Sequence, residues 1–245
     1  MGVDQQGLVF DSSVLDYERG RTTWPDAVVE GIDAEEVLDL AAGTGKLTRL
    51  LVKRFARVTA VEPLPSMRTL GAELLPEATW VEGTAEAIPL GDASTDAAFV
   101  AEAFHWFDSE RASDELARVL RPDAPLRILF TTWNGSFDPG MPPKAKEAFA
   151  TVARRTGPAG GAKMETGAWK DGLTIAAFAP LTEQRIDFDH VTDRSGMISY
   201  YLSISSIAAR PKAERDALRE ELESVVSEGA QHLSLTALVY DTHRV

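Results

Sequence analysis

The stretch that decides the fold is Val37-Leu38-Asp39-Leu40-Ala41-Ala42-Gly43-Thr44-Gly45-Lys46. It opens with a short, mainly apolar run that leads directly into a glycine turn, a pattern that predicts a buried strand ending in a tight turn. Beyond the turn, Leu47, Leu50, Leu51 and Phe55 recur at helical spacing and predict an amphipathic helix. The stretch therefore begins a strand–turn–helix unit.

Four more short apolar runs follow, separated by helical patterns or turns, and predict strands at 58–61, 79–81, 97–100 and 126–130. Before the last of these we expect a helix with Asp108 as its N-cap and Pro122 as its stop. Five β–α repeats imply a parallel sheet with helices on both faces. In such a sheet, ligands bind outside the carboxyl ends of the strands.

After Trp133 the pattern becomes less regular. We expect helices around 143–155, over 168–179 and, as a pair, within 193–228, and strands at 183–188 and 233–240. No linker or sequence repeat separates these parts, so the sequence predicts one domain, 1–245, of the α/β class with a doubly wound, mostly parallel seven-stranded sheet. An N-terminal segment, 1–30, and the insertions 134–167 and 193–228 are expected to cap the strand ends.

Composition and charge exclude several classes of function. With 25 Lys and Arg against 38 Asp and Glu, the formal net charge is −13, which argues against a nonspecific hold on nucleic acid. The absence of cysteine excludes disulfides and thiolate chemistry, and the four histidines show no metal-ligand spacing. There is neither a signal-peptide pattern nor a membrane-spanning apolar run, so we expect a cytoplasmic protein that binds no membrane.

The glycine turn allows several interpretations. A phosphate-binding P-loop requires glycine five residues before the Gly-Lys pair and a hydroxyl residue after it, and leucine stands in both places. A dinucleotide fingerprint requires a small residue three after Gly45, where Thr48 stands; this interpretation is weakened but open. S-adenosylmethionine has no phosphate, its cationic methionine end suits Asp39, and Glu62 ends the next strand, where an acid accepts ribose hydroxyls. An ordinary strand–helix turn is the alternative without a ligand.

Besides the glycine turn, several further segments, spread over most of the chain, form a pattern typical of a known protein family. They are Val61-Glu62-Pro63 followed by Met67, then 83–90, 103–107, 115–122, 201–206 and a strand ending at Tyr240. In this order and spacing the sequence resembles the class I S-adenosylmethionine-dependent methyltransferases, in the group that includes trans-aconitate methyltransferase (methyltransferase type 11). It departs from them near the N-terminus, where relatives often have Arg-Pro-x-Tyr-Pro after a tyrosine and this chain has Arg21-Thr22-Thr23-Trp24-Pro25.

The resemblance implies a Rossmann-like methyltransferase fold with a cofactor-binding half at 31–133 and a substrate-side half at 134–245. It implies S-adenosyl-L-methionine as cofactor and in-line methyl transfer to a small-molecule carboxylate, hydroxyl or amine. The cofactor-binding residues it implies are Tyr17, Arg21, Asp39, Ala41, Gly43, Gly45, Glu62, Pro63, Met67, Thr84, Ala85, Glu86, Glu102 and Phe104.

Their implied roles follow their places along the chain. The glycine turn lines the methionine and ribose end, and Glu62 holds the ribose hydroxyls. Met67 packs on the adenine, with a plain core position as the alternative, and 84–86 border the adenine edge. Glu102 and Phe104 face the methionine and the substrate. The N-terminal pair, Tyr17 and Arg21, closes over the cofactor, with a solvated arginine as the alternative.

His105 is the candidate catalytic base, because it follows the fourth strand beside Trp106, a candidate substrate-binding residue. A structural histidine bonded to the backbone is the alternative, and positioning alone supplies much of the acceleration of methyl transfer. In the cap, Tyr200, Tyr201 and Ser203 lie between two expected helices and are candidates to orient the acceptor; an ordinary helix surface is the alternative. A module that binds the cofactor without turnover, or an NAD-dependent oxidoreductase, stays open as another function.

Overall fold

The computed structural model describes residues 14–133, 167–175, 177–208 and 210–245. The chain divides into two compact units that interleave along the sequence. The larger unit takes 24–131, 160–186 and 237–245, and the smaller takes 1–23, 132–159 and 187–236. The prediction of one domain capped by 1–30, 134–167 and 193–228 stays a prediction.

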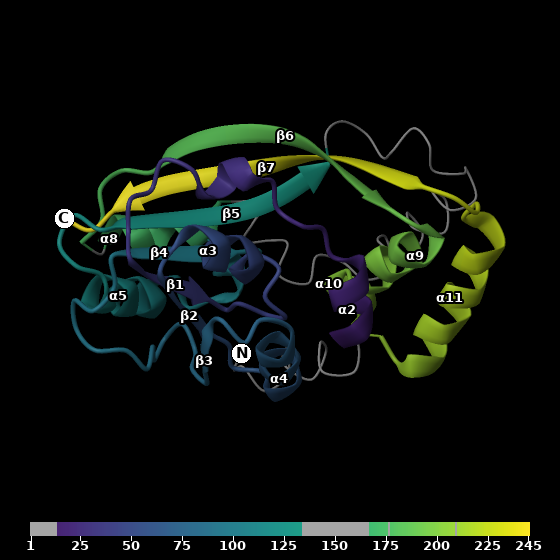
Figure 1. The fold of residues 1–245 in the computed structure, drawn as a ribbon, viewed down its shortest axis with the longest axis horizontal. Coiled ribbons are helices and arrows are strands. Elements are labelled where there is room, and N and C mark those ends of the chain that lie inside the picture. The colour runs from purple at the N-terminus through teal and green to yellow at the C-terminus, as the bar shows by residue number, and fades with distance from the viewer. Residues whose placement is uncertain (1–13, 134–166, 176, 209) are drawn as a thin grey trace. The chain divides into compact units, whose positions relative to one another are not determined.

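A seven-stranded mixed sheet with helices on both sides carries the fold (Figure 1), in the order β3-β2-β1-β4-β5-β7-β6. Its strands are β1 (Glu36–Leu40), β2 (Arg57–Val61), β3 (Thr79–Val81), β4 (Ala97–Ala101), β5 (Pro125–Trp133), β6 (Thr182–Thr192) and β7 (Gln231–His243). The strands β1 to β5 pair in parallel, whereas the arrow of β7 runs opposite to that of β5 (Figure 1). The predicted fold class is confirmed, and β6 and β7 are longer than the strands expected at 183–188 and 233–240.

The described helices also follow the sequence pattern, with some corrections. They are α2 (Val14–Gly20), α3 (Thr48–Arg54), α4 (Pro65–Leu74), α5 (Ser109–Val119), α8 (Asp171–Ile175), α9 (Arg194–Leu202), α10 (Ser205–Ala208) and α11 (Lys212–Val225), with 3-10 turns η1 (Asp26–Val29), η2 (Phe104–Trp106) and η3 (Ala168–Lys170). Asp108 caps α5 as predicted, accepting the Arg111 N–H at 3.3 Å. Region 193–228 holds three helices rather than two, and the helix expected at 168–179 is replaced by η3 and α8. The helix expected around 143–155 lies outside the described residues.

The core of the larger unit joins the central strands to α5 and η3. Leu38, Val100 and Ile128, from three neighbouring strands, are fully buried together with Leu116 of α5 and Trp169 of η3. A parallel strand covered by helices on both faces has no solvent side, so it is apolar along most of its length. This is why short apolar runs located β1, β2, β4 and β5, whereas β3, at the edge of the sheet, is only partly buried.

Arg127 of β5 is charged and yet only 8% exposed. Its guanidinium donates to both carboxylate oxygens of Asp241 on β7, at 2.6 and 2.9 Å, and to the carbonyls of Val28 and Glu30, each at 2.9 Å. A buried cation is tolerated when its donors are paired in this way. Arg127 therefore joins β5 to β7 and to the segment around η1.

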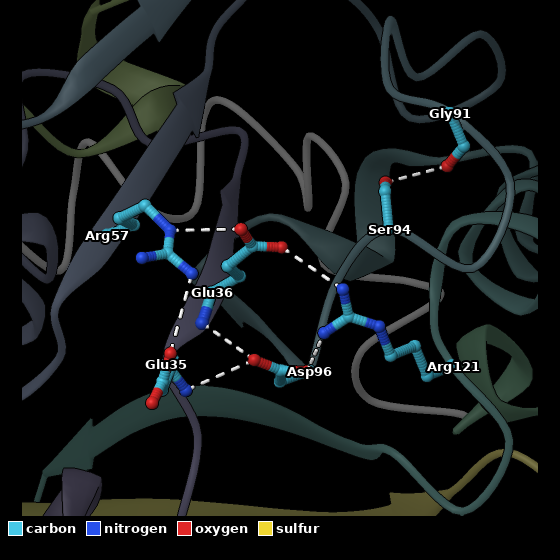
Figure 2. A network of polar contacts seen from close by, with 7 residues as sticks. All are labelled: Glu35, Glu36, Arg57, Gly91, Ser94, Asp96 and Arg121. Atoms are coloured by element: carbon cyan, nitrogen blue, oxygen red, sulfur yellow. Dashed lines mark hydrogen bonds and ion pairs between the residues drawn. The ribbon is translucent and has the colours of Figure 1, made fainter.

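A second polar network lies at the amino ends of β1, β2 and β4 (Figure 2). Asp96 accepts the N–H groups of Glu35 and Glu36 at 3.1 and 2.8 Å, and Arg121 pairs with both Asp96 and Glu36. Arg57 bonds Glu36 at 2.9 Å. Burial opposes ionisation of Asp96, but these hydrogen bonds outweigh it and lower its pKa. The network holds together the strand starts, at the edge opposite the carboxyl ends.

The smaller unit has its own apolar core, built from α9, α10, α11 and the first part of β7. On α2, Asp16 accepts the Ser199 hydroxyl at 3.0 Å and the Arg219 guanidinium at 2.7 Å. A methyl group at Gly20 would lie 2.1 Å from the backbone nitrogen of Tyr200. The helices α2 and α9 therefore approach so closely that only glycine fits at this point.

Candidate functional site

The larger unit brings together the predicted residues that follow β1 to β4, since parallel strands end at one edge of a sheet. Backbone hydrogen bonds continue just past the strand ends: Ala42 N–H bonds the Val61 carbonyl at 3.1 Å, Glu62 N–H that of Val81 at 3.1 Å, and Glu102 N–H that of Leu129 at 2.8 Å. The segments that carry the predicted site are thus fixed to one another by the sheet.

The backbone at these strand ends takes the left-handed conformation repeatedly. Gly43 and Gly45 have φ values of 61° and 89°, and Ala41 and Glu102 have values of 58° and 57°. Glycine adopts this region without penalty, but residues with a Cβ do so rarely and at a cost of about 1–3 kcal/mol. Such conformations cluster at ligand sites, so Ala41 and Glu102 are consistent with a site at the ends of β1 and β4, although Ala93 and Asp123, which do not follow these strands, also have positive φ values.

Asp39 lies on β1 with 1% of its surface exposed. Its Oδ2 accepts the hydroxyl of Thr48 at 2.6 Å. Burial raises the pKa of Asp39 to about 7; the hydrogen bonds from Thr48 oppose this rise and the negative charge of Glu62 adds to it. A cation placed beside this carboxyl would favour its charged form, so Asp39 can hold a positively charged group.

Glu62 follows β2 and is 4% exposed. One carboxylate oxygen accepts the Gly43 N–H at 2.8 Å and the other accepts the Leu64 N–H at 2.9 Å. Burial raises its pKa, while these two bonds and the charge of Arg68 oppose the rise. A carboxylate accepts about four hydrogen bonds, so Glu62 keeps one acceptor position on each oxygen, the arrangement that suits two neighbouring hydroxyls.

Gly45 has a packing role that the sequence did not indicate. A methyl group there would lie 2.5 Å from Leu75 and 3.3 Å from the ring of Trp80, and one at Gly71 would lie 2.2 Å from the same ring. The indole N–H of Trp80 donates to the Leu75 carbonyl at 3.1 Å. Trp80 therefore fills the space between the glycine turn and α4, and the predicted contact of Gly45 with a cofactor stays a prediction.

Beyond β2, an arginine fixes the chain next to Glu62 and Pro63. Arg68 donates to the carbonyls of Glu62 and Pro63, at 2.8 and 3.2 Å, and to the carboxylate of Glu82 at 2.7 Å. Its neighbour Met67 is 3% exposed. The sequence did not single out Arg68, because nothing in its spacing shows that it reaches back to the end of β2. The adenine contact of Met67 stays a prediction.

The segment predicted to border the adenine is bound to α5. Ala85 is buried within the apolar core, and the Glu86 carboxylate accepts the Asp108 N–H at 3.0 Å. Thr84 forms an antiparallel bridge with Ala87. Thr84 to Glu86 stay candidates for the adenine edge, but the side chain of Ala85 faces the core, which leaves its backbone for any ligand contact.

After β4, Glu102 and Phe104 are both engaged by the protein. Glu102 Oε1 accepts the backbone N–H and the hydroxyl of Thr131, at 2.6 and 2.5 Å. Phe104 is fully buried, with its ring centroid 5.4 Å from that of Phe107 and 5.7 Å from that of Trp169. The Phe104 ring is thus part of the core, and its predicted contact with the methionine is left to its backbone.

His105 and Trp106 are half-buried and begin a chain of rings. The ring of His105 lies 4.8 Å from that of Trp106 and 5.5 Å from that of Phe130. Trp169 continues the chain at 5.1 Å from Phe130, and Tyr240 lies 5.0 Å from Trp169. Trp169 is buried in the core of the larger unit. His105 is therefore held at the end of β4 by an aromatic wall.

The other predicted residues lie in the smaller unit. Tyr200 and Tyr201 are within α9 rather than between two helices, and both are buried in that unit's core. The Ser203 hydroxyl donates to the Tyr200 carbonyl at 2.7 Å, so it caps the helix end. Arg21 stacks 5.3 Å from the centroid of Tyr17 and donates to the Ser203 carbonyl at 3.0 Å. Their cofactor and substrate contacts stay predictions.

The part of the chain that the structure describes has neither a membrane-spanning helix nor a cluster of metal ligands. None of the helices in that part of the chain is both long and apolar enough to cross a membrane. Within the same residues, the His, Asp and Glu side chains form no group of three or more that could hold a metal ion.

Part of the larger unit is similar to a known protein family. Residues 38–128 match the family described as a methyltransferase domain. Over 128 residues the chain is 48% identical to an uncharacterized methyltransferase of Mycobacterium tuberculosis, the match covering 51% of this chain and 53% of that protein. The chain thus spans about half the length of the curated relatives it matches.

Two solved structures share the fold. A putative type II methyltransferase from Anaeromyxobacter dehalogenans aligns with a TM-score of 0.63 and 24% identity, over 91% of this chain and 97% of that one. The [4+2]-cyclase SpnF aligns with a TM-score of 0.57 and 16% identity, over 97% and 95%. The subgroup around trans-aconitate methyltransferase stays a prediction. Residues 38–128, which carry the strand-end carboxylates, are thus similar to the methyltransferase domain family, and the chain shares its fold with these two solved structures.

Proposed function

We propose that the chain catalyses S-adenosylmethionine-dependent methyl transfer to a small-molecule acceptor. The observation that carries the proposal is the pair of buried carboxylates, Asp39 and Glu62, at the ends of neighbouring parallel strands. Asp39 suits a cation, and Glu62 suits a pair of neighbouring hydroxyls. S-adenosylmethionine presents both groups, in its methionine ammonium and its ribose.

The glycine turn supports this cofactor over a dinucleotide. A pyrophosphate is held by backbone N–H groups that point at it. Here the N–H of Gly43 donates to the Glu62 carboxylate and that of Gly45 to the Ala42 carbonyl. Those two donors are engaged by the protein, and the buried acids beside them repel a phosphate. The donor set therefore fits a ligand without phosphate groups.

Each strand end has a proposed part in binding. Glu62 would hold the ribose hydroxyls, and Asp39 the ammonium. Met67 and the segment 84–86 would border the adenine. S-adenosylmethionine, when bound, supplies a methyl group activated by the positive sulfonium. The protein's contribution is to orient that methyl toward the acceptor and exclude water.

At the end of β4, His105 would take the proton from a hydroxyl or amine acceptor, and a carboxylate acceptor would need no base. Trp106 lies beside it and would form one wall of the acceptor site, where an aromatic face also attracts a sulfonium.

Calorimetric titration with S-adenosylhomocysteine, 5′-methylthioadenosine and NAD tests the cofactor. The first two ligands share the adenosine, and we expect both to bind while NAD does not. Glu62→Gln should lower the affinity for each of these two adenosine ligands by about 10- to 100-fold, which is the scale of hydrogen bonds to a charged group. The matched control is Glu36→Gln, at the opposite edge of the same sheet, which should leave both affinities unchanged. Binding of NAD alone would overturn the proposal.

A transfer assay tests turnover, because the fold by itself does not determine the reaction; SpnF, with the same fold, is a cyclase. The protein is incubated with methyl-labelled S-adenosylmethionine and a panel of organic acids, phenols and amines. Labelled product from any acceptor class supports the enzyme. Tight cofactor binding with no transfer to any class would favour a cofactor-binding module instead.

A further inference from the structure

Thr48, which the glycine-turn pattern does not require, makes a buried contact with Asp39. Its Oγ1 lies 2.6 Å from Asp39 Oδ2, and the two residues are 0% and 1% exposed. Asp39 belongs to β1 and Thr48 is the first residue of α3. The hydrogen bond therefore joins the two ends of the glycine turn.

The surroundings of Asp39 make Thr48 important for its ionisation. The residues opposite Asp39 on β2 and β4 are Ala60 and Phe99, both apolar. The charge that acts on Asp39 is that of Glu62, which disfavours a second negative charge. Burial and the charge of Glu62 both disfavour the ionised carboxyl, and the side-chain and backbone hydrogen bonds from Thr48 stabilise it.

We propose that Thr48 is a positioning residue that orients Asp39 and favours its charged form for the cationic methionine end of the cofactor. This rests on the proposed function. The Thr48 hydroxyl occupies part of the acceptor capacity of one oxygen, and the rest of the carboxylate remains for an ammonium group. The same bond sets the start of α3 relative to β1, so one hydroxyl controls both the charge and the place of the acid.

The choice of ligands separates this role from a general effect on the turn. S-adenosylhomocysteine carries the ammonium, whereas 5′-methylthioadenosine has the same adenosine and thioether without it. Thr48→Val keeps the side-chain shape and removes the hydroxyl. We expect this variant to bind S-adenosylhomocysteine about 10- to 100-fold more weakly than the wild type. Its affinity for 5′-methylthioadenosine should stay within about two-fold of the wild-type value. Thr48→Ser, which restores the hydroxyl, should bind like the wild type.

A double-mutant cycle shows whether Thr48 acts through Asp39. In an Asp39→Asn background, Thr48→Val should cause no further loss of S-adenosylhomocysteine affinity, because the charged partner is already gone. Additive losses would overturn the proposal. Thr48→Ala removes the same hydroxyl and takes the place of Thr48→Val if that variant does not fold. Thr95→Val, another buried threonine of the larger unit, controls for general loss of stability.

The pH dependence of binding is the second readout. Wild-type affinity for S-adenosylhomocysteine should fall as the pH drops through about 7, where Asp39 takes up a proton. Loss of the Thr48 hydroxyl raises the pKa of Asp39, so in Thr48→Val this fall should begin at higher pH, and in Thr48→Ser at the wild-type pH.

The remaining outcomes are distinguishable. Normal wild-type binding with an unchanged Thr48→Val would overturn the role of Thr48 and leave the proposed function intact. Equal losses for both ligands would also overturn it, because they indicate a distorted turn. A wild-type protein that binds neither adenosine ligand would overturn the proposed function and this inference together.

Discussion

Asp39 and Glu62 are acids that the protein buries at the ends of adjacent strands, and burial raises the pKa of each. Such groups are unfavourable for the free protein, and they are retained where a ligand completes their pairing. Their effects on stability and on binding should therefore have opposite signs. Single substitutions at the strand ends can separate the two.

Asp39→Asn is predicted to stabilise the free protein at pH 8. The folded pKa of Asp39, about 7, exceeds the unfolded value of 3.8, so the folded form retains a proton that the unfolded chain loses. The free energy of unfolding therefore falls between about pH 4 and pH 7 and stays low above that window. Urea denaturation should show a gain of roughly 2–4 kcal/mol at pH 8, with little gain near pH 4.

Asp96→Asn, at the opposite edge of the sheet, is the control, because it should change the free energy of unfolding at pH 8 in the opposite direction. Its folded pKa is lowered, so its contribution to stability is present above the unfolded pKa and is lost as the pH falls through the folded one. This variant should be less stable at pH 8 by about 1–3 kcal/mol. Destabilisation by Asp39→Asn at pH 8 would contradict the inference that burial of the charged Asp39 carboxylate lowers the stability of the free protein.

His105→Gln is predicted to separate catalysis from cofactor binding. If His105 is the base for a hydroxyl or amine acceptor, kcat should fall by about 10²- to 10⁴-fold. Affinity for S-adenosylhomocysteine should not change. Measured turnover equal to that of the wild type would assign His105 to the aromatic wall alone.

At the scale of elements, long side chains tie together segments that are distant in the sequence. Arg127 joins β5 to β7 and to the carbonyls around η1, Arg68 connects the ends of β2 and β3, and Trp80 fills the space beneath the glycine turn. These contacts hold the strand ends in register, so they position the site without touching the proposed ligand.

Arg127→Met is predicted to reduce the free energy of unfolding by about 2–4 kcal/mol. It removes the donors of two carbonyls and of the Asp241 carboxylate; the ion pair is buried on the arginine side, with side chains 9% and 34% exposed, and losing one partner of such a pair is destabilising. Arg57→Met is the comparison: its ion pair with Glu36 has side chains 59% and 36% exposed, and exposed pairs contribute about 0–1 kcal/mol. Urea denaturation should rank the two variants in this order, and equal losses would refute the role of Arg127.

At the scale of the whole molecule, two compact units with separate apolar cores share one chain. Unit boundaries fall within β5, β6 and β7, and another, between Thr23 and Trp24, falls in the loop between α2 and η1. The strand-end carboxylates and the matched family region lie in the larger unit. The smaller unit carries Tyr17, Arg21, Tyr200, Tyr201 and Ser203.

Gly20→Ala is predicted to loosen the smaller unit selectively. The added methyl group would meet the backbone of α9 at 2.1 Å, so α2 and α9 must separate. Hydrogen exchange measured by mass spectrometry should increase in α2, α9 and α11 and stay unchanged in β1 to β4. Gly31→Ala is the control, because a methyl group there meets nothing within 4 Å, although its φ of 75° adds local strain. Faster exchange across the whole sheet would show that the units are not independent.

Much of the fold and part of the candidate site can be predicted from the sequence. Strands β1, β2, β4 and β5 appear as apolar runs because helices cover both faces of a parallel sheet, and Asp39 and Glu62 stand out because each comes at the end of such a run. Asp108 was predictable as a cap because capping acts within one helical turn. The family resemblance rested on the same local segments.

The remaining features depend on contacts between residues far apart in the chain. The sequence showed Thr48 as a mismatch to a dinucleotide pattern, and the tertiary structure shows it bonded to Asp39. Nothing in the spacing of Arg127 and Asp241 indicates that they pair, and Phe104, expected at a ligand, is in the core. Periodicity reports which residues are buried within one element, whereas the partner of a buried group is chosen when elements pack, so only the tertiary structure decided these contacts.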